Sequence, residues 1–119
     1  MLLLTSCNLF GPTVSKGKYS YSSKYGTIYI ELLSGSDCVV YFDGCSERQG
    51  SYYVDGETIS LSGYARDWGE SGKNRYWVTY TFHGTEGGTI TDRDKFVLKA
   101  DVVYGNTDKE EICTFIKRN

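Results

Sequence analysis

The dipeptide Asp55-Gly56 lies between two short runs in which apolar and polar residues alternate. A two-residue Asp-Gly loop supplies the positive φ angles of the tight turn that joins antiparallel strands. A turn centred on this dipeptide places Tyr52 opposite Ile59, with Leu61 further along the same face. Because a shift of one residue would exchange the two faces, the alternation predicts a hairpin with one buried face and one wet face.

Similar alternating runs recur along the rest of the chain, separated by turns rich in Gly, Ser and Asp. We expect eight strands, at about residues 18–22, 27–33 and 38–43, in the two halves of the 50–62 hairpin, and at about residues 75–83, 95–104 and 110–117. Residues 63–74 and 84–94 carry many glycines and charges, and we expect them to be loops. Such connections are too short for helical crossovers, so the strands should pair as an antiparallel meander.

An open row of strands would leave two unpaired edges, which promote aggregation. Closure into a barrel removes both edges, and the interior of an eight-stranded barrel either fills with side chains or holds one small ligand. We therefore predict an all-β fold, an eight-stranded antiparallel meander closed into a barrel, with a β-sandwich as the alternative. The side chains expected to point inward are Tyr19, Tyr21, Ile28, Ile30, Leu32, Tyr52, Ile59, Leu61, Tyr76, Val78, Tyr80, Phe82, Phe96, Leu98 and Val102. For the third and eighth strands the sequence does not decide which face points inward, because apolar residues occur on both of their faces.

Tyrosines also alternate with the inward residues of neighbouring strands. Tyr29, Tyr41 and Tyr53 are expected on the outside of the second, third and fourth strands, where they would form an aromatic stripe. Such a stripe could bind a glycan, although cross-strand packing is the simpler account of it.

The length of 119 residues suits a single domain. A net charge of −2 and a pI near 5.3 argue against binding to nucleic acid, which requires a basic face. The only histidine is His83 and no two cysteines are closely spaced, so no zinc-site pattern is present. No motif marks a nucleophile with a base either. We therefore expect no metal, no cofactor and no catalytic residues, and we interpret His83 as an ordinary surface side chain.

The first seven residues, Met1-Leu-Leu-Leu-Thr-Ser-Cys7, resemble the end of a secretory signal that carries the bacterial lipobox, in which Cys7 would become the lipidated N-terminus. A basic segment is missing and the apolar run is shorter than the roughly 7–15 residues of a complete signal. We interpret residues 1–16 as a signal-peptide remnant with a lipobox-like cysteine and a tether, and residues 17–119 as one β-barrel domain. A disordered apolar N-terminus, or a short first strand with Cys7 buried, is the alternative.

If Cys7 carries lipid, three further cysteines remain in an oxidising compartment, and at most one disulfide can form among them. Cys38 and Cys45 would lie roughly 23 Å apart on an extended strand, at about 3.3 Å per residue. A disulfide tolerates a Cα–Cα distance of up to about 7 Å, which disfavours this pair. Pairing of Cys113 with either of them and the absence of any disulfide both stay open.

Three further stretches resemble the small lipocalin-like lipoproteins of gut bacteria. They are the opening strand Gly17-Lys-Tyr-Ser-Tyr21, a hairpin similar to the family's Gly-x-Tyr-x-x-Asp-Gly-x-x-Ile pattern that begins at Gly50, and a closing strand that ends in Thr114-Phe-Ile-Lys117. Tyr19 stands where the family often has Trp. The resemblance implies a lipocalin-like barrel anchored to a bacterial cell envelope, with the membrane as partner through the lipid on Cys7. Most members have no assigned activity, so the family supplies no functional residue.

The strongest candidates for a binding site are aromatic residues near the predicted loop 63–74, because binding residues concentrate on loops held by a rigid scaffold. They are Tyr64, Trp68, Tyr76 and Trp77, with Tyr52 on the barrel wall. We expect a non-catalytic protein that holds a small apolar or amphipathic ligand in the barrel. The alternative is a surface recognition module for glycan or protein. Trp68 could instead plug one end of the barrel.

Overall fold

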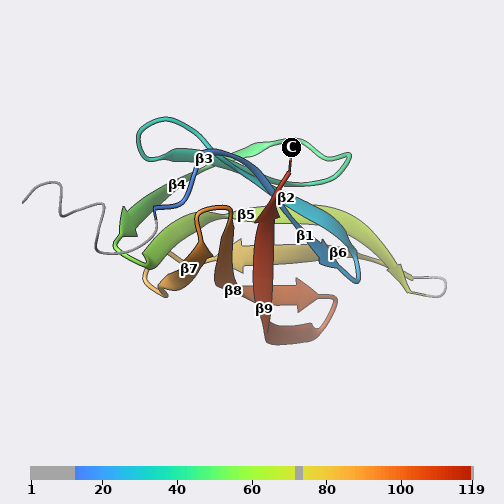
Figure 1. The fold of residues 1–119 in the computed structure, drawn as a ribbon. Helices are drawn as coiled ribbons and strands as arrows, with labels where there is room; N and C mark the ends of the chain where they lie inside the picture. The colour runs from blue at the N-terminus through green and yellow to red at the C-terminus, as the bar shows by residue number, and fades with distance from the viewer. Residues whose placement is uncertain (1–12, 72–73, 119) are drawn as a thin grey trace, which may run out of the picture.

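Nine β-strands form the part of the chain that the structure describes, residues 13–71 and 74–118 of a computed structural model (Figure 1). The strands are β1 (Gly17–Ser23), β2 (Gly26–Leu32), β3 (Asp37–Phe42), β4 (Arg48–Asp55), β5 (Thr58–Ser71), β6 (Asn74–Phe82), β7 (Gly88–Asp92), β8 (Lys95–Tyr104) and β9 (Thr107–Lys117). None of these described residues is helical. Cys7 lies outside the described residues.

The strands pair as one closed antiparallel ring. Each strand from β1 to β5 pairs with the next, β8 pairs with both β6 and β9, and β9 pairs with β1. β7 is the extra strand, because it pairs with β5 and β8 and so extends the place of β6 beyond the interruption at residues 83–87. The fold is thus an eight-stranded antiparallel barrel with one additional strand. This confirms the predicted fold class and is consistent with a lipocalin-like fold.

The β4–β5 hairpin forms as predicted, but its register differs from the prediction by two residues. Tyr52 pairs with Leu61, and Ile59 pairs with Val54. The loop consists of residues 56–57, since Gly56 has a φ of +62° and takes the first loop position while Asp55 remains in β4. A shift by two residues preserves the faces, so Tyr52, Ile59 and Leu61 still point inward.

The two predicted loops are wrong in large part. Residues 63–71 continue β5 and pair with β6 from Gly63↔Phe82 to Ser71↔Asn74. Residues 88–92 form β7. Glycine and charge indicate loops only where no partner strand is available, and the partner strand satisfies these backbone groups along almost the whole stretch.

The core follows the predicted alternation closely. Of the expected inward side chains, all are buried except Tyr21, which is half-buried, and Tyr76, which is 36% exposed. Tyr76 was expected inside, but the pairing of β6 with β8 ends at Val78↔Tyr104, so Tyr76 lies past the end of the barrel interior. The structure also shows which faces of β3 and β9 point inward. They are the faces that carry the buried residues Cys38, Val40, Phe42, Cys113 and Phe115.

Aromatic rings fill the middle of the barrel. The ring centroids of Phe96 and Phe115 are 5.5 Å apart, and those of Tyr19 and Phe96 are 4.7 Å apart. Phe82 packs edge-on against Phe115 at 5.8 Å. Packed rings of this kind contribute large buried areas, so this cluster is a main source of stability.

The expected outer stripe of three tyrosines is not formed. Tyr29 and Tyr41 are direct cross-strand partners with ring centroids 5.4 Å apart, and the Lys18 ammonium lies 5.0 Å and 5.9 Å from the two centroids. Tyr53 of β4 pairs with Ser60 of β5, not with a residue of β3, and its side chain is 66% exposed. The Tyr29–Tyr41 pair is therefore cross-strand packing, and Tyr53 stands apart from it.

Candidate functional site

The aromatic residues predicted to form a binding site occupy three different places. Tyr64, Trp68 and Trp77 lie on the outer face of the β5–β6 hairpin, whose tip reaches past the neighbouring strands in Figure 1. Tyr76 lies on the opposite face of β6, and Tyr52 lies in the wall near the other end of the barrel. The prediction placed the first four close together because residues 63–74 were expected to be a loop.

Two arginines, Arg66 of the hairpin and Arg48 of β4, join the three rings. We call this set the aromatic–arginine ladder: Arg48, Tyr64, Arg66, Trp68 and Trp77. The Trp68 and Trp77 rings meet edge to face with centroids 4.6 Å apart. The Arg66 guanidinium lies 5.6 Å from the centroid of Trp77 and 5.8 Å from that of Tyr64. Arg48 lies 4.8 Å from the Tyr64 centroid and donates a 2.9 Å hydrogen bond from Nη1 to the Tyr64 hydroxyl.

The alternation of the two strands creates this ladder. Ala65 of β5 and Val78 of β6 are buried, so their sequence neighbours on either side must point outward. Trp68 and Trp77 are direct cross-strand partners, which brings their rings into contact. Arg66 is held along the hairpin by a 3.2 Å hydrogen bond from Nε to Thr79 Oγ1.

The ladder is open to solvent. The exposed fraction is 37% for Tyr64, 39% for Trp68 and 53% for Trp77. Large aromatic side chains exposed together on one face are characteristic of interaction sites, because their burial by a partner is favourable. Stacked guanidinium groups add several hydrogen-bond donors to the ring faces. The arrangement can therefore bind a partner that offers both apolar and acceptor groups. Trp68 does not plug the barrel, contrary to one of the alternatives above.

Tyr76 has a structural position. Its ring packs edge-on against Tyr104 at a centroid distance of 5.5 Å. It also covers Gly105, whose φ is +58° and where an added Cβ would meet the Tyr76 ring at 3.1 Å. Tyr76 thus packs on the β8–β9 turn and is separate from the ladder.

Tyr52 helps to close the end of the barrel near the start of β1. Its hydroxyl accepts a 2.6 Å hydrogen bond from Lys16 Nζ and donates a 3.0 Å hydrogen bond to the Leu33 carbonyl. Beside it, the Tyr19 hydroxyl donates a 2.6 Å bond to the Ser15 carbonyl. A shallow groove of about 290 Å³ lies next to Tyr52, between the residues before β1 and the 35–36 turn. The hydroxyl of Tyr52 is fully engaged within the protein.

A partly buried polar cluster of Tyr21, Tyr80 and Glu111 was not predicted from the sequence. Tyr21 and Tyr80 both donate a hydrogen bond to Glu111 Oε2, the latter at 2.9 Å. Burial raises the pKa of both tyrosine hydroxyls above the ordinary range, and the hydrogen bond to Glu111 raises each of them further. Glu111 shares its face of β9 with Cys113 and Phe115, so a known strand orientation would have revealed it.

His83 has a partner that the sequence did not indicate. Its Nε2 lies 2.8 Å from Asp101 Oδ2 on β8. Both side chains are well exposed, and an ion pair in such a place contributes only about 0–1 kcal/mol. The pair is a surface contact of the β6–β8 wall.

The described thiols are free and show no sign of activation. Burial raises the pKa of Cys38 and Cys113 to about 12, and it also raises the pKa of the less buried Cys45. Since the thiolate is the nucleophilic form, these raised pKa values disfavour reaction of the three thiols near neutral pH. Across the described residues, no group of three or more His, Cys, Asp or Glu side chains is placed to hold a metal ion. Within the same ranges, no helix has the length and apolar character needed to cross a membrane.

Fold and surface together define a class: an all-β, eight-stranded antiparallel barrel that displays an aromatic–arginine ladder on its outer wall. A comparison with protein-family models finds no match, and comparisons with curated proteins and with solved structures find none either. The residues themselves must therefore carry the functional argument.

Proposed function

We propose that the protein is a non-catalytic recognition module of the bacterial cell envelope, and that it binds carbohydrate through the aromatic–arginine ladder. The supporting observation is that the solvent-exposed rings of Tyr64, Trp68 and Trp77 share one face with the guanidinium groups of Arg48 and Arg66. Sugar rings offer C–H groups that pack on aromatic faces, and hydroxyl or carboxylate oxygens that accept hydrogen bonds from arginine.

A small apolar or amphipathic ligand inside the barrel is the function that the sequence favoured, with surface recognition as its alternative. Such a ligand would have to displace the fully buried rings of Tyr19, Phe96 and Phe115, of which Phe96 packs against the other two. Emptying a packed aromatic site costs roughly 3–5 kcal/mol per ring. Binding at the ladder requires no such displacement, and for this reason we favour the surface.

Attachment to the envelope rests on the lipobox-like stretch that ends in Cys7. One acyl chain gives only marginal membrane binding, so stable anchoring needs more than one chain, as the resemblance to bacterial lipoproteins implies. Expression of the full chain behind a complete lipoprotein signal in a bacterial host should give a membrane-bound protein with a lipid mass on Cys7. The Cys7→Ala protein should be released into the soluble fraction, and a membrane-bound Cys7→Ala protein would contradict lipid anchoring.

The proposal that the protein is not an enzyme is supported by the exposed position of the His83–Asp101 pair. It is also supported by the raised pKa values of the described thiols, which keep them protonated.

The carbohydrate proposal is tested on an array of bacterial, plant and host glycans with the wild-type protein and the Trp77→Ala variant. Loss of the most exposed ring should weaken binding about tenfold or more, since aromatic residues at the centre of a site usually dominate its affinity. Tyr64→Ala is a second variant that leaves the Trp68–Trp77 pair intact and should also weaken binding.

Tyr53→Ala is the matched control, because Tyr53 is an even more exposed aromatic residue outside the ladder. A folded Trp77→Ala protein that binds the same glycans with unchanged affinity would overturn the proposal. The absence of binding to any carbohydrate by the wild-type protein, together with ladder-dependent binding to a protein, would replace carbohydrate with a protein partner.

A further inference from the structure

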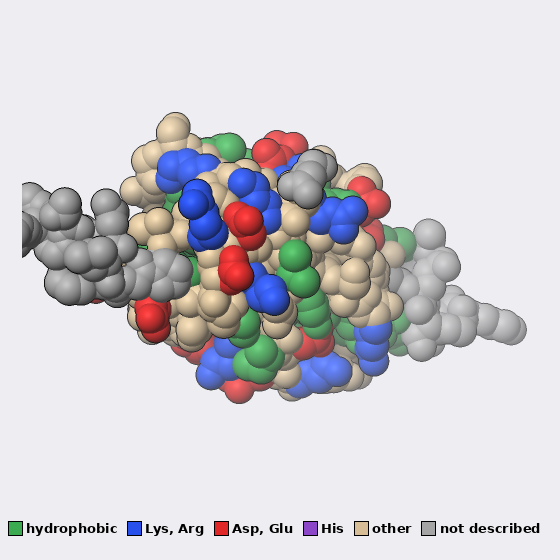
Figure 2. All heavy atoms as spheres, in the orientation of Figure 1, with side chains coloured by type: hydrophobic (Ala, Val, Ile, Leu, Met, Phe, Trp, Pro, Cys, Tyr) green, Lys and Arg blue, Asp and Glu red, His purple; other side chains and the backbone are tan. Residues whose placement is uncertain are grey.

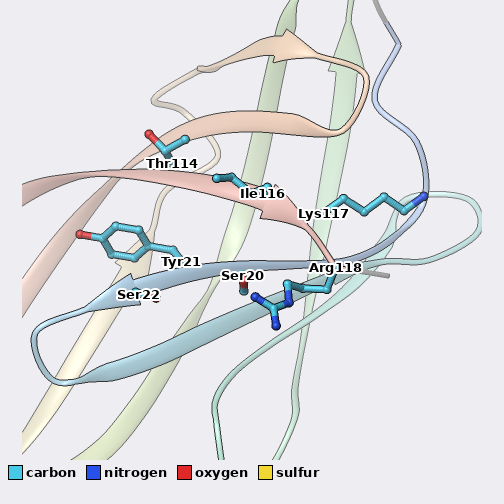
Figure 3. A pocket seen from close by; sticks show the side chains of 7 residues that line it. All are labelled: Ser20, Tyr21, Ser22, Thr114, Ile116, Lys117 and Arg118. Atoms are coloured by element: carbon cyan, nitrogen blue, oxygen red, sulfur yellow. The ribbon is translucent and has the colours of Figure 1, made fainter.

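The barrel is incompletely paired where its first and last strands meet. β1 and β9 pair only at Tyr19↔Lys117 and Ser20↔Ile116. Beyond these pairs the two strands separate, and a groove of about 600 Å³ lies between them (Figure 3). We call this opening the seam. The residues that line it are Ser20, Tyr21, Ser22, Thr114, Ile116, Lys117 and Arg118.

The direction of the backbone groups along β9 follows from two hydrogen bonds. The Arg118 N–H donates to the Lys18 carbonyl at 2.7 Å, on the β1 side, and the Lys117 N–H donates to the Asp94 carbonyl at 3.0 Å, on the β8 side. Successive residues of a strand point their backbone groups to opposite sides. Thr114 therefore directs its N–H and C=O into the seam, and Ile112, just beyond the groove, directs its own to the same side; β1 no longer pairs with either residue.

Side chains line the seam but do not complete the sheet. The Tyr21 ring lies between the two strands, 5.8 Å from the Phe115 centroid, and forms the floor (Figure 3). On the outside of β9, Ile112 is 63% exposed and Ile116 is 51% exposed. Figure 2, drawn in the orientation of Figure 1, shows hydrophobic side chains at the surface near the centre of the view, among charges of both signs.

Charge along the seam is unequal at its two ends. Lys117 and Arg118 line the end where β1 and β9 are paired, and no acidic side chain lines the groove. Glu110 lies on β9 beyond Ile112, and its Oε2 forms an ion pair with Lys99 Nζ at 3.7 Å. A segment that ran along the seam would thus meet positive charge at the end that Lys117 and Arg118 line.

We propose that the seam binds an extended segment of another polypeptide, which pairs with β9 as an antiparallel strand and carries an acidic side chain at its N-terminal end. An unpaired strand edge is satisfied by backbone hydrogen bonds from a further strand, and neighbouring side chains supply specificity. The segment takes the place that β1 leaves, so it runs in the direction of β1. Its N-terminal side chain then lies near Arg118. The seam lies outside the aromatic–arginine ladder, so this inference does not depend on carbohydrate binding.

The probe is a capped peptide of sequence Glu-Thr-Val-Thr-Val-Thr-Lys. Its control has the same composition with the two charged residues exchanged. Titration of the ¹⁵N-labelled protein should shift the amide signals of Ser22, Ile112 and Thr114 and slow their hydrogen exchange. The exchanged-charge peptide should bind about tenfold more weakly, because complementary charges at an interface determine register and orientation. A version N-methylated at alternate amides should lose binding, because it lacks the donors that pair with a strand edge.

Two variants keep the test independent of folding. Arg118→Ala should remove the preference between the two peptides while the protein retains its melting temperature. Arg93→Ala, an exposed arginine in the turn before β8, should retain the preference. Signal shifts confined to the ladder, equal binding of the N-methylated peptide, or an unchanged preference in Arg118→Ala would each overturn the proposal. Sedimentation that shows a dimer paired through β9 would also overturn it, with a second copy as the occupant.

Discussion

Strand β9 is held in different ways on its two flanks. On the β8 flank, ten residue pairs run without interruption from Lys95↔Ile116 to Tyr104↔Thr107. On the β1 flank, two pairs are followed by side-chain contacts: the Tyr21 hydroxyl donates a hydrogen bond to Glu111, and the Tyr21 ring lies 5.8 Å from the Phe115 centroid. The main chain closes one flank, whereas beyond two residue pairs the Tyr21 side chain bridges the other. A barrel can therefore be closed in topology and still present an open strand edge.

The largest expected change in the free energy of unfolding comes from the inner face of β9, and a matched substitution on its outer face should change it little. Phe115→Ala removes a fully buried ring that contacts Tyr21, Phe82 and Phe96, and should lower the free energy of unfolding by about 3–5 kcal/mol. Ile112→Ala is the matched control on the exposed face and should change it by less than about 0.5 kcal/mol. Urea unfolding followed by tyrosine and tryptophan fluorescence measures both. Equal effects would mean that the core does not extend to the β9 wall.

A smaller loss of stability is expected from the side-chain hydrogen bonds to Glu111 on the β1 flank of β9. Glu111→Ala leaves the hydroxyls of Tyr21 and Tyr80 without their shared acceptor and should cost about 1–3 kcal/mol. Hydrogen exchange should quicken at Tyr19 and Ser20 more than along the β8 flank. Glu110→Ala, a neighbouring carboxylate on the outer face, should have little effect on either measurement. Uniform acceleration on both flanks would contradict a separate side-chain closure.

The protein should lose stability at alkaline pH, because buried groups near β9 keep their protons in the folded state. Burial holds the pKa of Tyr80 above its ordinary value of 10.0 and raises the pKa of Cys113 from 9.0 to about 12. Above about pH 9 the unfolded chain loses protons that the folded chain retains, so stability must fall as the pH rises. Each such group contributes at most about 1.4 kcal/mol per pH unit within its window.

Urea unfolding at several pH values between neutral and strongly alkaline measures this slope. The Tyr80→Phe variant should have a shallower slope, because it lacks the buried hydroxyl. The Tyr53→Phe variant should retain the wild-type slope, because Tyr53 is exposed. Identical slopes in all three proteins would show that Tyr80 ionises alike in the folded and unfolded states.

The sequence predicted the parts of this fold that depend on local alternation. The bounds of β8 and the inward side chains of β2 follow from it, since each contains one clearly apolar face. It did not predict the seam, because pairing between the first and last strands leaves no local pattern. The exposed position of Tyr76 and the placement of Glu111 were missed for the same reason, because each depends on a strand distant in sequence. Tyr76 is exposed because the pairing of β6 with β8 ends before it, and the inward orientation of Glu111 depends on how β9 packs in the barrel. The ladder residues were identified by type, whereas their arrangement required the β5–β6 register.

The smallest effect concerns the hairpin that carries the ladder, which differs from the seam because its backbone is paired to the tip. Trp77→Ala removes one ring of the Trp68–Trp77 pair, a contact worth about 0.5–1.5 kcal/mol beyond its buried area. The loss should be local, since β6 pairs with β8 only from Val78 onward. Hydrogen exchange should therefore quicken at residues 67–69 and 76–77, while the midpoint of global unfolding changes little. A large drop in that midpoint would mean that the Trp pair supports the barrel itself, and the ladder would then be a structural element as well as a recognition surface.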